Sequence, residues 1–284
     1  MKPFLLLQTD FSNTWGAVAS MKGVIKLVDP ALEIYDLCHD IRTFDPWEAS
    51  LSLAAVEPYW PAGTVIVSVV DPGVGTARRS CVALLNDGTY VVTPDNGTLT
   101  HLKHGVGIKA VREIGPEHRF PAKEEVSVFH GRDIFAYCAA RLAAGQISFA
   151  EVGPEYPAAE AVECPEFSLT PEIHGDTVNT WLMTGLAHFG GVQFYLSNEA
   201  WERLGHREGE SVRVTITCRG ETVFDRAVLY GTSFGSVPVG EPVLYRGSSQ
   251  YLSLDCNQDS FMRKFGVGFG KDWKARLSRT ERED

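Results

Sequence analysis

Residues 64–80 read TVIVSVVDPGVGTARRS. The apolar run at Val65–Val70 is typical of a strand that is buried on both faces of a parallel sheet. The run stops at Asp71, a glycine-rich turn follows, and the stretch closes on Arg78 and Arg79. A carboxylate, flexible glycines and a guanidinium at the carboxyl end of a buried strand are a common setting for chemistry in α/β proteins. The plainer interpretation is a loop between strands that carries a surface arginine pair.

The composition is that of an ordinary globular chain. Its 284 residues are 44% hydrophobic and 22% charged, which allows two domains or one large domain with a sizeable core. The net charge of −10 argues against a general nucleic-acid binder and against a polybasic membrane-surface protein. We therefore expect neither nucleic acid nor membrane as a partner, whereas the charge is compatible with a small cationic ligand.

The cysteines indicate a reducing compartment. Six are spread along the chain without a CxxC pair or a Cys/His cluster, so we expect free thiols, no disulfide framework and no zinc. The N-terminal MKPFLLLQTDF has too short an apolar run for a signal peptide, and no segment reaches the roughly 18 apolar residues of a membrane span. These features predict a soluble, cytoplasmic protein.

Strands and helices alternate over the first half of the chain. This pattern predicts an α/β domain with a largely parallel sheet over residues 1–165. The expected strands are Phe4–Gln8, Ile34–Leu37 and Val65–Val70, with a hairpin formed by Ser80–Leu85 and Tyr90–Thr93 and an extended segment at Val126–Phe129. The expected helices are Gly16–Val28, a helix that starts at Asp45-Pro46, and Ile134–Ala144.

The patterning changes near residues 166–175, which we expect to link two domains. Short strands separated by turns then predict a smaller all-β, barrel-like domain over residues 176–284. The charged tail, Lys271–Asp284, is expected to fray. The expected strands of this domain are Thr177–Leu182, Val192–Leu196, Ser211–Thr217, Val223–Leu229 and Tyr251–Leu254.

Several polar side chains stand where predicted strands end or helices begin. Because the ends of parallel strands share one rim of the sheet, such residues can converge from distant parts of the sequence. An Asp–Arg–His set suits the activation of water, since histidine can take a proton near neutral pH and arginine stabilises developing hydroxide. Each residue also has a plain structural interpretation as a helix cap or a surface charge. The candidates are Asp10, Asp71 with Arg78, Asp95-Asn96 and His130.

Four motifs follow one another along the N-terminal domain: TDF at 9–11 with MKG at 21–23, DPGVGTARR at 71–79, PDNGTLT at 94–100 and FHGRDIF at 129–135. In this order and spacing they resemble the S-adenosylmethionine hydroxide adenosyltransferase family, which is related to fluorinating and chlorinating enzymes that act on the same substrate. The resemblance implies an α/β domain paired with a β-barrel-like C-terminal domain. It also implies a homotrimer, with sites between the N-terminal domain of one subunit and the C-terminal domain of its neighbour.

The resemblance assigns roles to particular residues. The family's water-activating Asp, Arg and His match Asp71, Arg78 and His130. The halide-coordinating serine of the fluorinase falls at Gly131, and that enzyme's tyrosine and threonine fall at Asp71 and Val74, so the resemblance implies water rather than halide as the nucleophile. The positions implied for binding the adenosyl substrate are Asp10 as the ribose-binding carboxylate, Phe44, Asn96, Gly131, Phe189, Ser248 and Asn257.

The C-terminal motifs depart from the family pattern. Where relatives carry Asp, His, Phe, Gly and Asn, this chain reads Ala187-His188-Phe189-Gly190-Gly191. The Asp that contacts the methionine amino group and the Asn that reads adenine are therefore absent. SSQYL at 248–252 and Asn257-Gln258 resemble later family motifs, with Asp255 in an unusual place. The methionine half of the substrate is the open part of this prediction.

The leading prediction is an enzyme that hydrolyses S-adenosyl-L-methionine to adenosine and L-methionine, with no cofactor and no metal. Activated water would attack C5′. His130 is the first choice as proton acceptor, Asp71 is the alternative base, and Arg78 would hold the hydroxide. Two alternatives are hydrolysis or halide displacement on another 5′-substituted adenosine, and a non-catalytic sensor of adenosine or S-adenosylmethionine.

Overall fold

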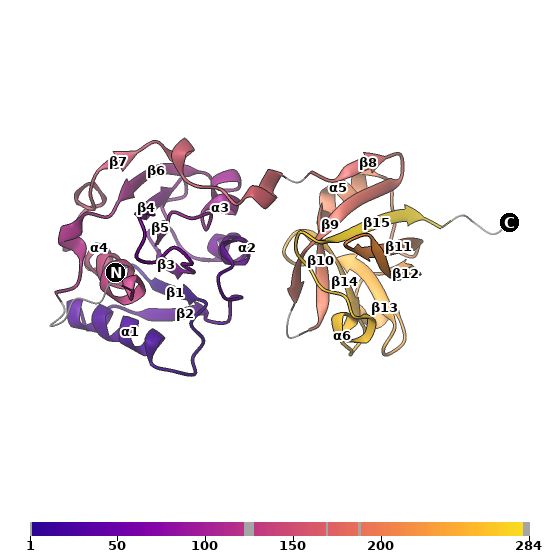
Figure 1. Cartoon of the computed structure of the whole chain (residues 1–284), viewed down its shortest axis with the longest axis horizontal. Coiled ribbons are helices and arrows are strands. Elements are labelled where there is room, and N and C mark those ends of the chain that lie inside the picture. Colours follow the sequence, from indigo (N-terminus) through magenta and orange to yellow (C-terminus); the bar gives the residue numbers. More distant parts are fainter. Residues whose placement is uncertain (1, 122–127, 169, 187–188, 281–284) are drawn as a thin grey trace. The chain divides into compact units, whose positions relative to one another are not determined.

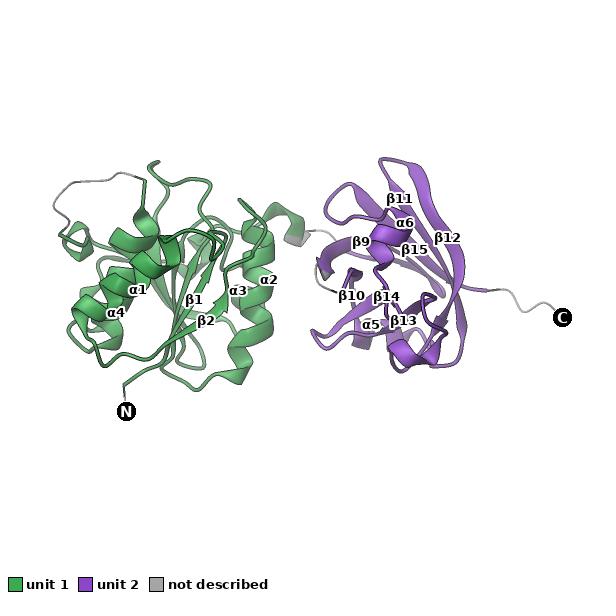
Figure 2. Cartoon of the chain, turned by 90° about the horizontal axis from the view of Figure 1, so that it is seen from below, with its two compact units in different colours: residues 1–167 green, residues 168–284 purple. Residues whose placement is uncertain are grey.

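The computed structural model describes residues 2–121, 128–168, 170–186 and 189–280. The chain forms two compact units, residues 1–167 and residues 168–284 (Figure 2), and each has its own sheet and hydrophobic core. The expected linker at 166–175 includes β8 (Glu172–His174), which pairs with the sheet of the second unit.

The first unit is built on a mixed sheet whose first four neighbouring strands run parallel (Figure 1). The apolar run at 65–70 supplies an interior strand of this sheet, as its composition predicts. The expected α/β domain with a largely parallel sheet is confirmed. In the order in which they neighbour one another, the strands are β2 (Ile34–Cys38), β1 (Leu5–Thr9), β3 (Val65–Val69), β5 (Tyr90–Pro94), β4 (Ser80–Leu85), β6 (Ile108–Glu113) and β7 (Glu155–Tyr156).

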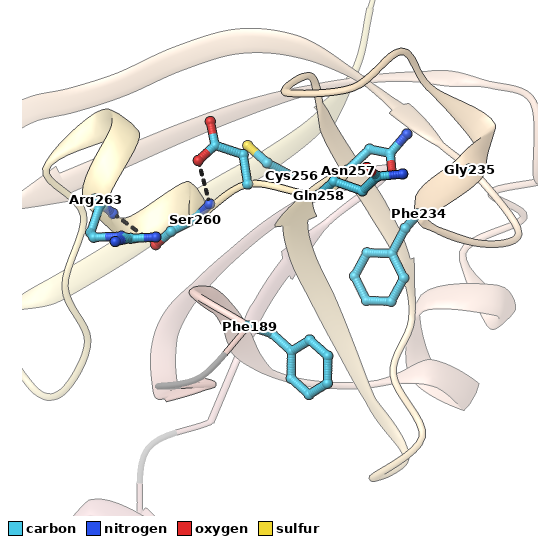
Figure 3. A pocket seen from close by; sticks show the side chains of 9 residues that line it. Phe189, Phe234, Gly235, Cys256, Asn257, Gln258, Ser260 and Arg263 are labelled. Atoms are coloured by element: carbon cyan, nitrogen blue, oxygen red, sulfur yellow. Dashed lines mark hydrogen bonds between the residues drawn. The ribbon is translucent and has the colours of Figure 1, made fainter.

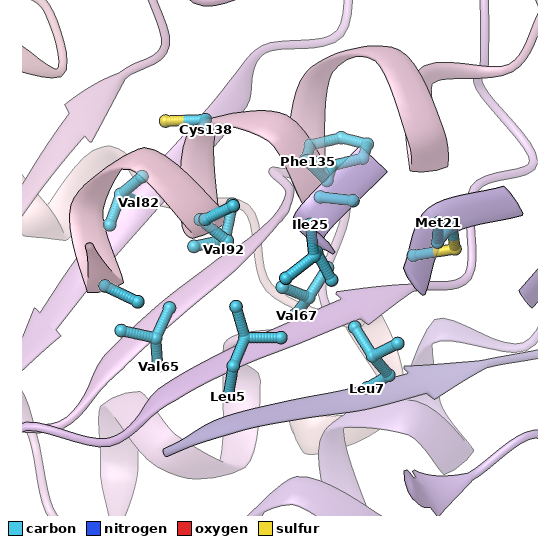
Figure 4. Close-up of a cluster of buried hydrophobic side chains, with 14 of the residues drawn as sticks. Leu5, Leu7, Met21, Ile25, Val65, Val67, Val82, Val92, Phe135 and Cys138 are labelled. Carbon is cyan, nitrogen blue, oxygen red and sulfur yellow. The ribbon is translucent and has the colours of Figure 1, made fainter. Parts of the chain in front are cut away.

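Helices pack against both faces of this sheet because its strands are apolar on both sides. Leu5 and Leu7 point toward one face, where they pack with Ile25 (Figure 4). Leu6 belongs to the cluster on the other face together with Leu53. The helices are α1 (Ala17–Val28), α2 (Pro46–Val56), α3 (Thr100–His104), the π-helical η3 (Gly131–Ala136) and α4 (Tyr137–Ala143); short 3-10 turns are η1 (Glu57–Tyr59), η2 (Pro116–His118), η4 (Phe149–Glu151), η5 (Ala158–Glu160) and η6 (Pro165–Ser168).

Two local predictions in this unit are confirmed. The helix expected to start at Asp45-Pro46 is α2, and the Asp45 side chain caps it by accepting a hydrogen bond from the backbone N–H of Glu48 at 3.2 Å. The strands β4 and β5 form the expected antiparallel hairpin. The extended segment expected at 126–129 lies partly outside the described residues, and its described part forms no strand. The helix expected from Ile134 begins three residues earlier, with η3, immediately after His130.

The second unit is a closed β-barrel. Its strands follow one another round a ring, which closes where β10 pairs with β9. All pairs in the ring are antiparallel except β12 with β13. This confirms the expected barrel-like domain. Round the ring the strands are β10 (Gly191–Ser197), β14 (Tyr251–Cys256), β13 (Pro242–Arg246), β12 (Glu221–Tyr230), β11 (Ser211–Cys218), β15 (Trp273–Arg279) and β9 (Thr177–Leu186).

The prediction that the tail frays from Lys271 is wrong for β15. This strand lies between β11 and β9, and its alternate residues Ala275 and Leu277 are buried in the barrel core. The charged residues that alternate with them, Lys274 and Arg276, are exposed, so the high charge conceals a two-residue alternation. Two short helices, α5 (Asn198–Arg203) and α6 (Phe261–Phe265), and the 3-10 turn η7 (Phe234–Ser236) complete this unit.

Candidate active site

Asp71, Arg78 and His130 meet in the first unit. Asp71 follows the carboxyl end of β3, and the Nε of Arg78 donates to its Oδ1 at 2.9 Å and to its Oδ2 at 3.1 Å. The Nη2 of Arg78 pairs with Oδ2 of the same carboxylate and also lies 2.8 Å from Nδ1 of His130. The structure therefore joins the three predicted catalytic side chains in one network, although His130 is 52 positions from Arg78 in the sequence.

The contact with Arg78 determines which ring nitrogen of His130 carries the proton. A guanidinium only donates hydrogen bonds, so Nδ1 must be the acceptor, and a neutral ring then carries its hydrogen on Nε2. Burial lowers the pKa of His130, and the nearby charges of Arg78 and Arg119 lower it further, against the opposing effect of Asp71 and Asp133. The imidazole is thus held neutral at physiological pH.

The turn after β3 fixes the Arg78 side chain. Its Nη1 donates to the hydroxyl of Ser80 at 2.6 Å, and its guanidinium carbon lies 5.2 Å from the ring centroid of Phe135. A Cβ on Gly73 would come within 3.2 Å of the Arg78 Cγ, so the arginine packs closely over the turn. The Arg78 and Asp71 side chains are only 10% and 6% exposed. At this burial the ion pair is weakly screened, which keeps the guanidinium oriented.

The neighbouring Arg79 contacts a different carboxylate from Arg78. It donates to the buried carboxylate of Asp95 at 3.1 Å and stacks 4.0 Å from the ring of Tyr156. The hydroxyl of Tyr156 also donates to Asp95, at 3.0 Å. This cluster holds the loop after β5, whose Asn96 donates to the carbonyl of Val70 at 2.8 Å. Asn96 thus ties that loop to the strand end that carries Asp71.

Asp10 and Phe44 also lie together. The backbone N–H of Phe44 donates to Oδ2 of Asp10 at 2.9 Å. Burial raises the pKa of Asp10, the Phe44 N–H opposes this, and the charge of Asp71 raises the pKa further. The Phe44 ring is 69% exposed, and its backbone adopts φ +65°, which is unusual for a bulky residue. The contact with Asp10 accompanies this strained turn.

A histidine that the sequence analysis did not single out holds the loop around Asp10. The Nδ1 of His39 lies 2.8 Å from the hydroxyl of Thr9, and its carbonyl accepts from Ser12 N–H at 2.8 Å. Its Nε2 lies 3.0 Å from Asp36. The signal was weak, because a single histidine after a short strand has no spacing that distinguishes it.

Gly131 leaves no spare room beside His130. A Cβ at this position would lie 3.1 Å and 3.3 Å from two ring carbons of Phe11. These distances are tighter than ordinary carbon contacts, so Phe11 would have to shift to admit a serine side chain. The geometry agrees with the absence of a halide-coordinating hydroxyl here.

The second unit contains a cavity of about 630 Å³ lined by two aromatic rings (Figure 3). The Phe189 and Phe234 rings lie within 15° of parallel, with their centroids 6.4 Å apart. Asn257 lines the same cavity, and its side-chain N–H donates to the Val237 carbonyl at 2.8 Å. The structure thus brings the predicted Phe189 and Asn257 together and adds Phe234, which sits in a segment without strand or helix periodicity.

Other predicted positions lie elsewhere. Ser248 is exposed in the turn between β13 and β14 and does not line this cavity. Ala187 and His188, where the departure from the family pattern begins, lie outside the described residues.

All six cysteines are free thiols.

Within the described residues, no three His, Cys, Asp or Glu side chains gather in a way that could hold a metal ion. Among the helices of the described part, none has the length and apolar character needed to cross a membrane.

Comparison with known proteins agrees with these two units. Residues 5–153 match the SAM hydroxide adenosyltransferase N-terminal domain, and residues 187–274 match the C-terminal domain of the same family. An (R)-S-adenosyl-L-methionine hydrolase of Salinispora tropica is 36% identical over 71% of this chain and 75% of that protein. A protein of the same name from Thermus thermophilus is 32% identical over 95% of this chain and 98% of that protein.

The fold also resembles that of a solved structure. The crystal structure of an uncharacterized conserved protein from Thermotoga maritima superposes with a TM-score of 0.87 at 28% identity, covering 97% of this chain and all of that one. The matches include both units and the motifs that carry Asp71, Arg78 and His130. The chain belongs to the SAM hydroxide adenosyltransferase family.

Proposed function

We propose that this protein hydrolyses S-adenosyl-L-methionine to adenosine and L-methionine. The observation that carries the proposal is the buried network in which Arg78 contacts both Asp71 and His130. The relatives named above support the substrate, because each is described as an (R)-S-adenosyl-L-methionine hydrolase. Asp71, Arg78 and His130 are the proposed catalytic residues.

The reaction needs little acid–base chemistry. Water attacks C5′, the C5′–S bond breaks, and methionine leaves as a neutral thioether, so no general acid is required. Attack by developing hydroxide on a sulfonium cancels charge, and such a step is favoured where bulk water is excluded. The remaining tasks are to align the water with the C5′–S bond and to take its proton.

The network suits these tasks. Arg78 donates to the oxygen as negative charge develops on it, and Asp71 keeps the guanidinium in place. As Arg78 turns its Nη2 from His130 to the attacking oxygen, water takes its place as the donor to Nδ1, and the freed Nδ1 lone pair accepts the proton from that water. Because nearby positive charge and burial favour the neutral ring, His130 is available as a base at physiological pH.

Other residues would bind the substrate. Asp10 would accept hydrogen bonds from the ribose hydroxyls, with Phe44 beside it. The Phe189 and Phe234 rings would hold the flat adenine ring, because aromatic faces stack on heteroaromatic rings. Asn96 and Gly131 would act by shaping the loops on either side of the catalytic network. Ser248 and Asn257 are the proposed contacts in the second unit.

We also propose that the protein is a homotrimer and works in the cytoplasm. The trimer follows from the family resemblance, in which residues from different copies complete each site. The free cysteines support a reducing compartment. Sedimentation equilibrium of the full chain tests the trimer: a mass of three chains is expected, and a monomer would contradict it.

Product analysis tests the proposed reaction. The purified protein is incubated with S-adenosyl-L-methionine in halide-free buffer, and the products are separated and identified by mass. Adenosine and methionine in equal amounts are expected. Binding without any product would point to a sensor instead, and a 5′-halo-adenosine formed on adding chloride would point to halide displacement.

A further inference from the structure

A buried carboxyl group lies in β14 of the second unit. Asp255 is 1% exposed, and its Oδ2 accepts a hydrogen bond from the Tyr245 hydroxyl at 2.7 Å. Its Oδ1 is also buried and has no hydrogen-bond partner among the described residues. A buried carboxyl oxygen without a partner is unfavourable by a few kcal/mol or more, so such a group usually has a reason other than stability.

The Asp255 carboxyl group fits in this place because the neighbouring strand carries a glycine. A Cβ built on Gly191 of β10 would lie 1.7 Å from Oδ1 of Asp255 and 2.0 Å from its Cγ. No side chain at position 191 can therefore coexist with Asp255 in this place. The glycine found where the family resemblance leads us to expect Asn, and the unusual Asp255, are thus two parts of one arrangement.

Asp255 connects to the aromatic rings of the cavity through Tyr245. The ring of Tyr245 packs against Phe234 with centroids 5.0 Å apart. Phe234 in turn lies nearly parallel to Phe189, and Figure 3 shows the two rings side by side at the cavity. The chain then returns from Phe189 through Gly190 to Gly191, beside Asp255, so the contacts form a closed circuit.

The backbone between Phe189 and Gly191 is also held in place. A Cβ on Gly190 would lie 2.1 Å from the Ser260 hydroxyl oxygen, and the Gly190 carbonyl accepts from the backbone N–H of Met262 at 2.8 Å. Phe189 is thereby anchored through the residue that follows it. The backbone at Phe234 is held by a capping box between Ser233 and Ser236, and the ring of Tyr245 packs on the Phe234 side chain. With the backbone held at both phenylalanines, the contact with the Tyr245 ring acts on the orientation of the Phe234 ring.

We infer that Asp255 is a positioning residue for the adenine ring of the substrate, acting through Tyr245 on the Phe189–Phe234 pair. The identity of the ring rests on the proposed function. The carboxyl group fixes the Tyr245 hydroxyl, the tyrosine ring orients the Phe234 ring, and the Phe189 and Phe234 rings stay nearly parallel at the cavity. Asp255 does not touch the ligand, since both the residue and its free oxygen are buried.

The test compares variants of the full chain by the affinity of adenosine, measured by calorimetry. Tyr245→Phe removes only the hydroxyl, and Asp255→Ala removes its acceptor; each is expected to weaken adenosine binding about tenfold, the equivalent of one lost hydrogen bond. Asp255→Asn keeps an acceptor for Tyr245 and should restore the affinity to within about twofold of the wild type. Tyr230→Phe removes a tyrosine hydroxyl elsewhere in the barrel and should change nothing.

Kinetics and structure separate positioning from general stability. If the protein turns over its substrate, Tyr245→Phe should raise KM and leave kcat nearly unchanged, because ring binding is equally present in the ground and transition states. A crystal structure of Tyr245→Phe should show the Phe189–Phe234 centroid distance altered from 6.4 Å. Wild-type affinity in both Tyr245→Phe and Asp255→Ala would overturn the inference, as would an unmoved Phe234. The adenosine affinity and the crystal structure do not require hydrolysis, so an inactive protein would contradict the proposed function and leave these two measurements intact.

Discussion

The Nη2 of Arg78 lies 2.8 Å from Nδ1 of His130 while the same guanidinium is paired with Asp71. One cation thus orients two potential bases, and its charge adds to the effect of burial in lowering the pKa of the imidazole. The arrangement resolves what residue types alone leave open, because it specifies which ring nitrogen of His130 faces the guanidinium. It also makes the contribution of each side chain separately testable.

The planar geometry of the Arg78 guanidinium should matter more for turnover than its positive charge. Arg78→Lys keeps a cation but loses the paired contacts to Asp71 and the contact to His130, so turnover should fall about 100-fold, nearly as far as in Arg78→Ala. Initial rates of adenosine formation provide the measurement. Arg203→Ala, which removes an exposed arginine of α5, is the control and should leave the rate unchanged. Full activity in Arg78→Lys would contradict the geometric role.

The pH dependence should report the lowered pKa of His130. A neutral ring is required, so the acid limb of kcat/KM should lie below the ordinary histidine value of about 6.5. Arg78→Gln removes a charge that lowers the pKa of His130. The acid limb of the variant's residual activity should therefore lie at a higher pH than that of the wild type. An acid limb above pH 7 in the wild type would contradict the assignment.

The same group should affect stability with a defined sign. Because the folded state binds the His130 proton less readily than the unfolded chain, its contribution to the free energy of unfolding is fully present above about pH 6.5 and is lost as the pH falls below that value. His130→Gln should reduce this part of the pH dependence, which urea unfolding at a series of pH values can measure. An unchanged pH dependence would show that His130 is not held neutral by folding.

Positions 191 and 255 should be strongly coupled in stability. Gly191→Ala places a methyl group on the Asp255 carboxyl and should destabilise the protein by at least about 2 kcal/mol. Adding Asp255→Ala should recover most of that loss, because the double variant removes the clash. As a control, a Cβ on Gly23 of α1 would meet nothing within 4 Å, so Gly23→Ala should stabilise the helix by about 1 kcal/mol. Simple additivity at 191 and 255 would contradict the steric account.

Complementation tests whether different copies complete one site. Arg78→Ala impairs the proposed catalytic network, and Phe189→Ala impairs the aromatic pair of the second unit. Under the proposed homotrimer, coexpression of the two variants should yield mixed trimers that regain activity, whereas each variant alone remains impaired. Mixed trimers with no gain over either variant would contradict sites shared between copies.

Sequence patterns predicted the sheet of the first unit because its strands are locally encoded. The apolar run that becomes β3, the hairpin of β4 and β5, and the Asp45 cap all depend on neighbours in the sequence. The rim of a parallel sheet explains why Asp71, Arg78 and His130 could be grouped in advance. Their hydrogen-bond pattern could not be, because it depends on a contact 52 positions apart.

The missed features depend on tertiary packing. The charges that alternate with the buried residues of β15 make its sequence typical of a fraying tail. Phe234 lies in a short turn without helix or strand periodicity, and its ring contacts Phe189 and Tyr245, which are distant in the sequence. Asp255 interrupts a buried strand, and only its fit over Gly191 explains how a carboxyl group is accommodated there.

The most direct test of the proposed reaction is hydrolysis of S-adenosyl-L-methionine in ¹⁸O-labelled water. Attack of water at C5′ predicts adenosine carrying one labelled oxygen at its 5′-hydroxyl and methionine carrying no label, with the signal lost in His130→Ala and Arg78→Ala. Unlabelled adenosine, or label appearing instead in the amino-acid product, would contradict water attack at C5′.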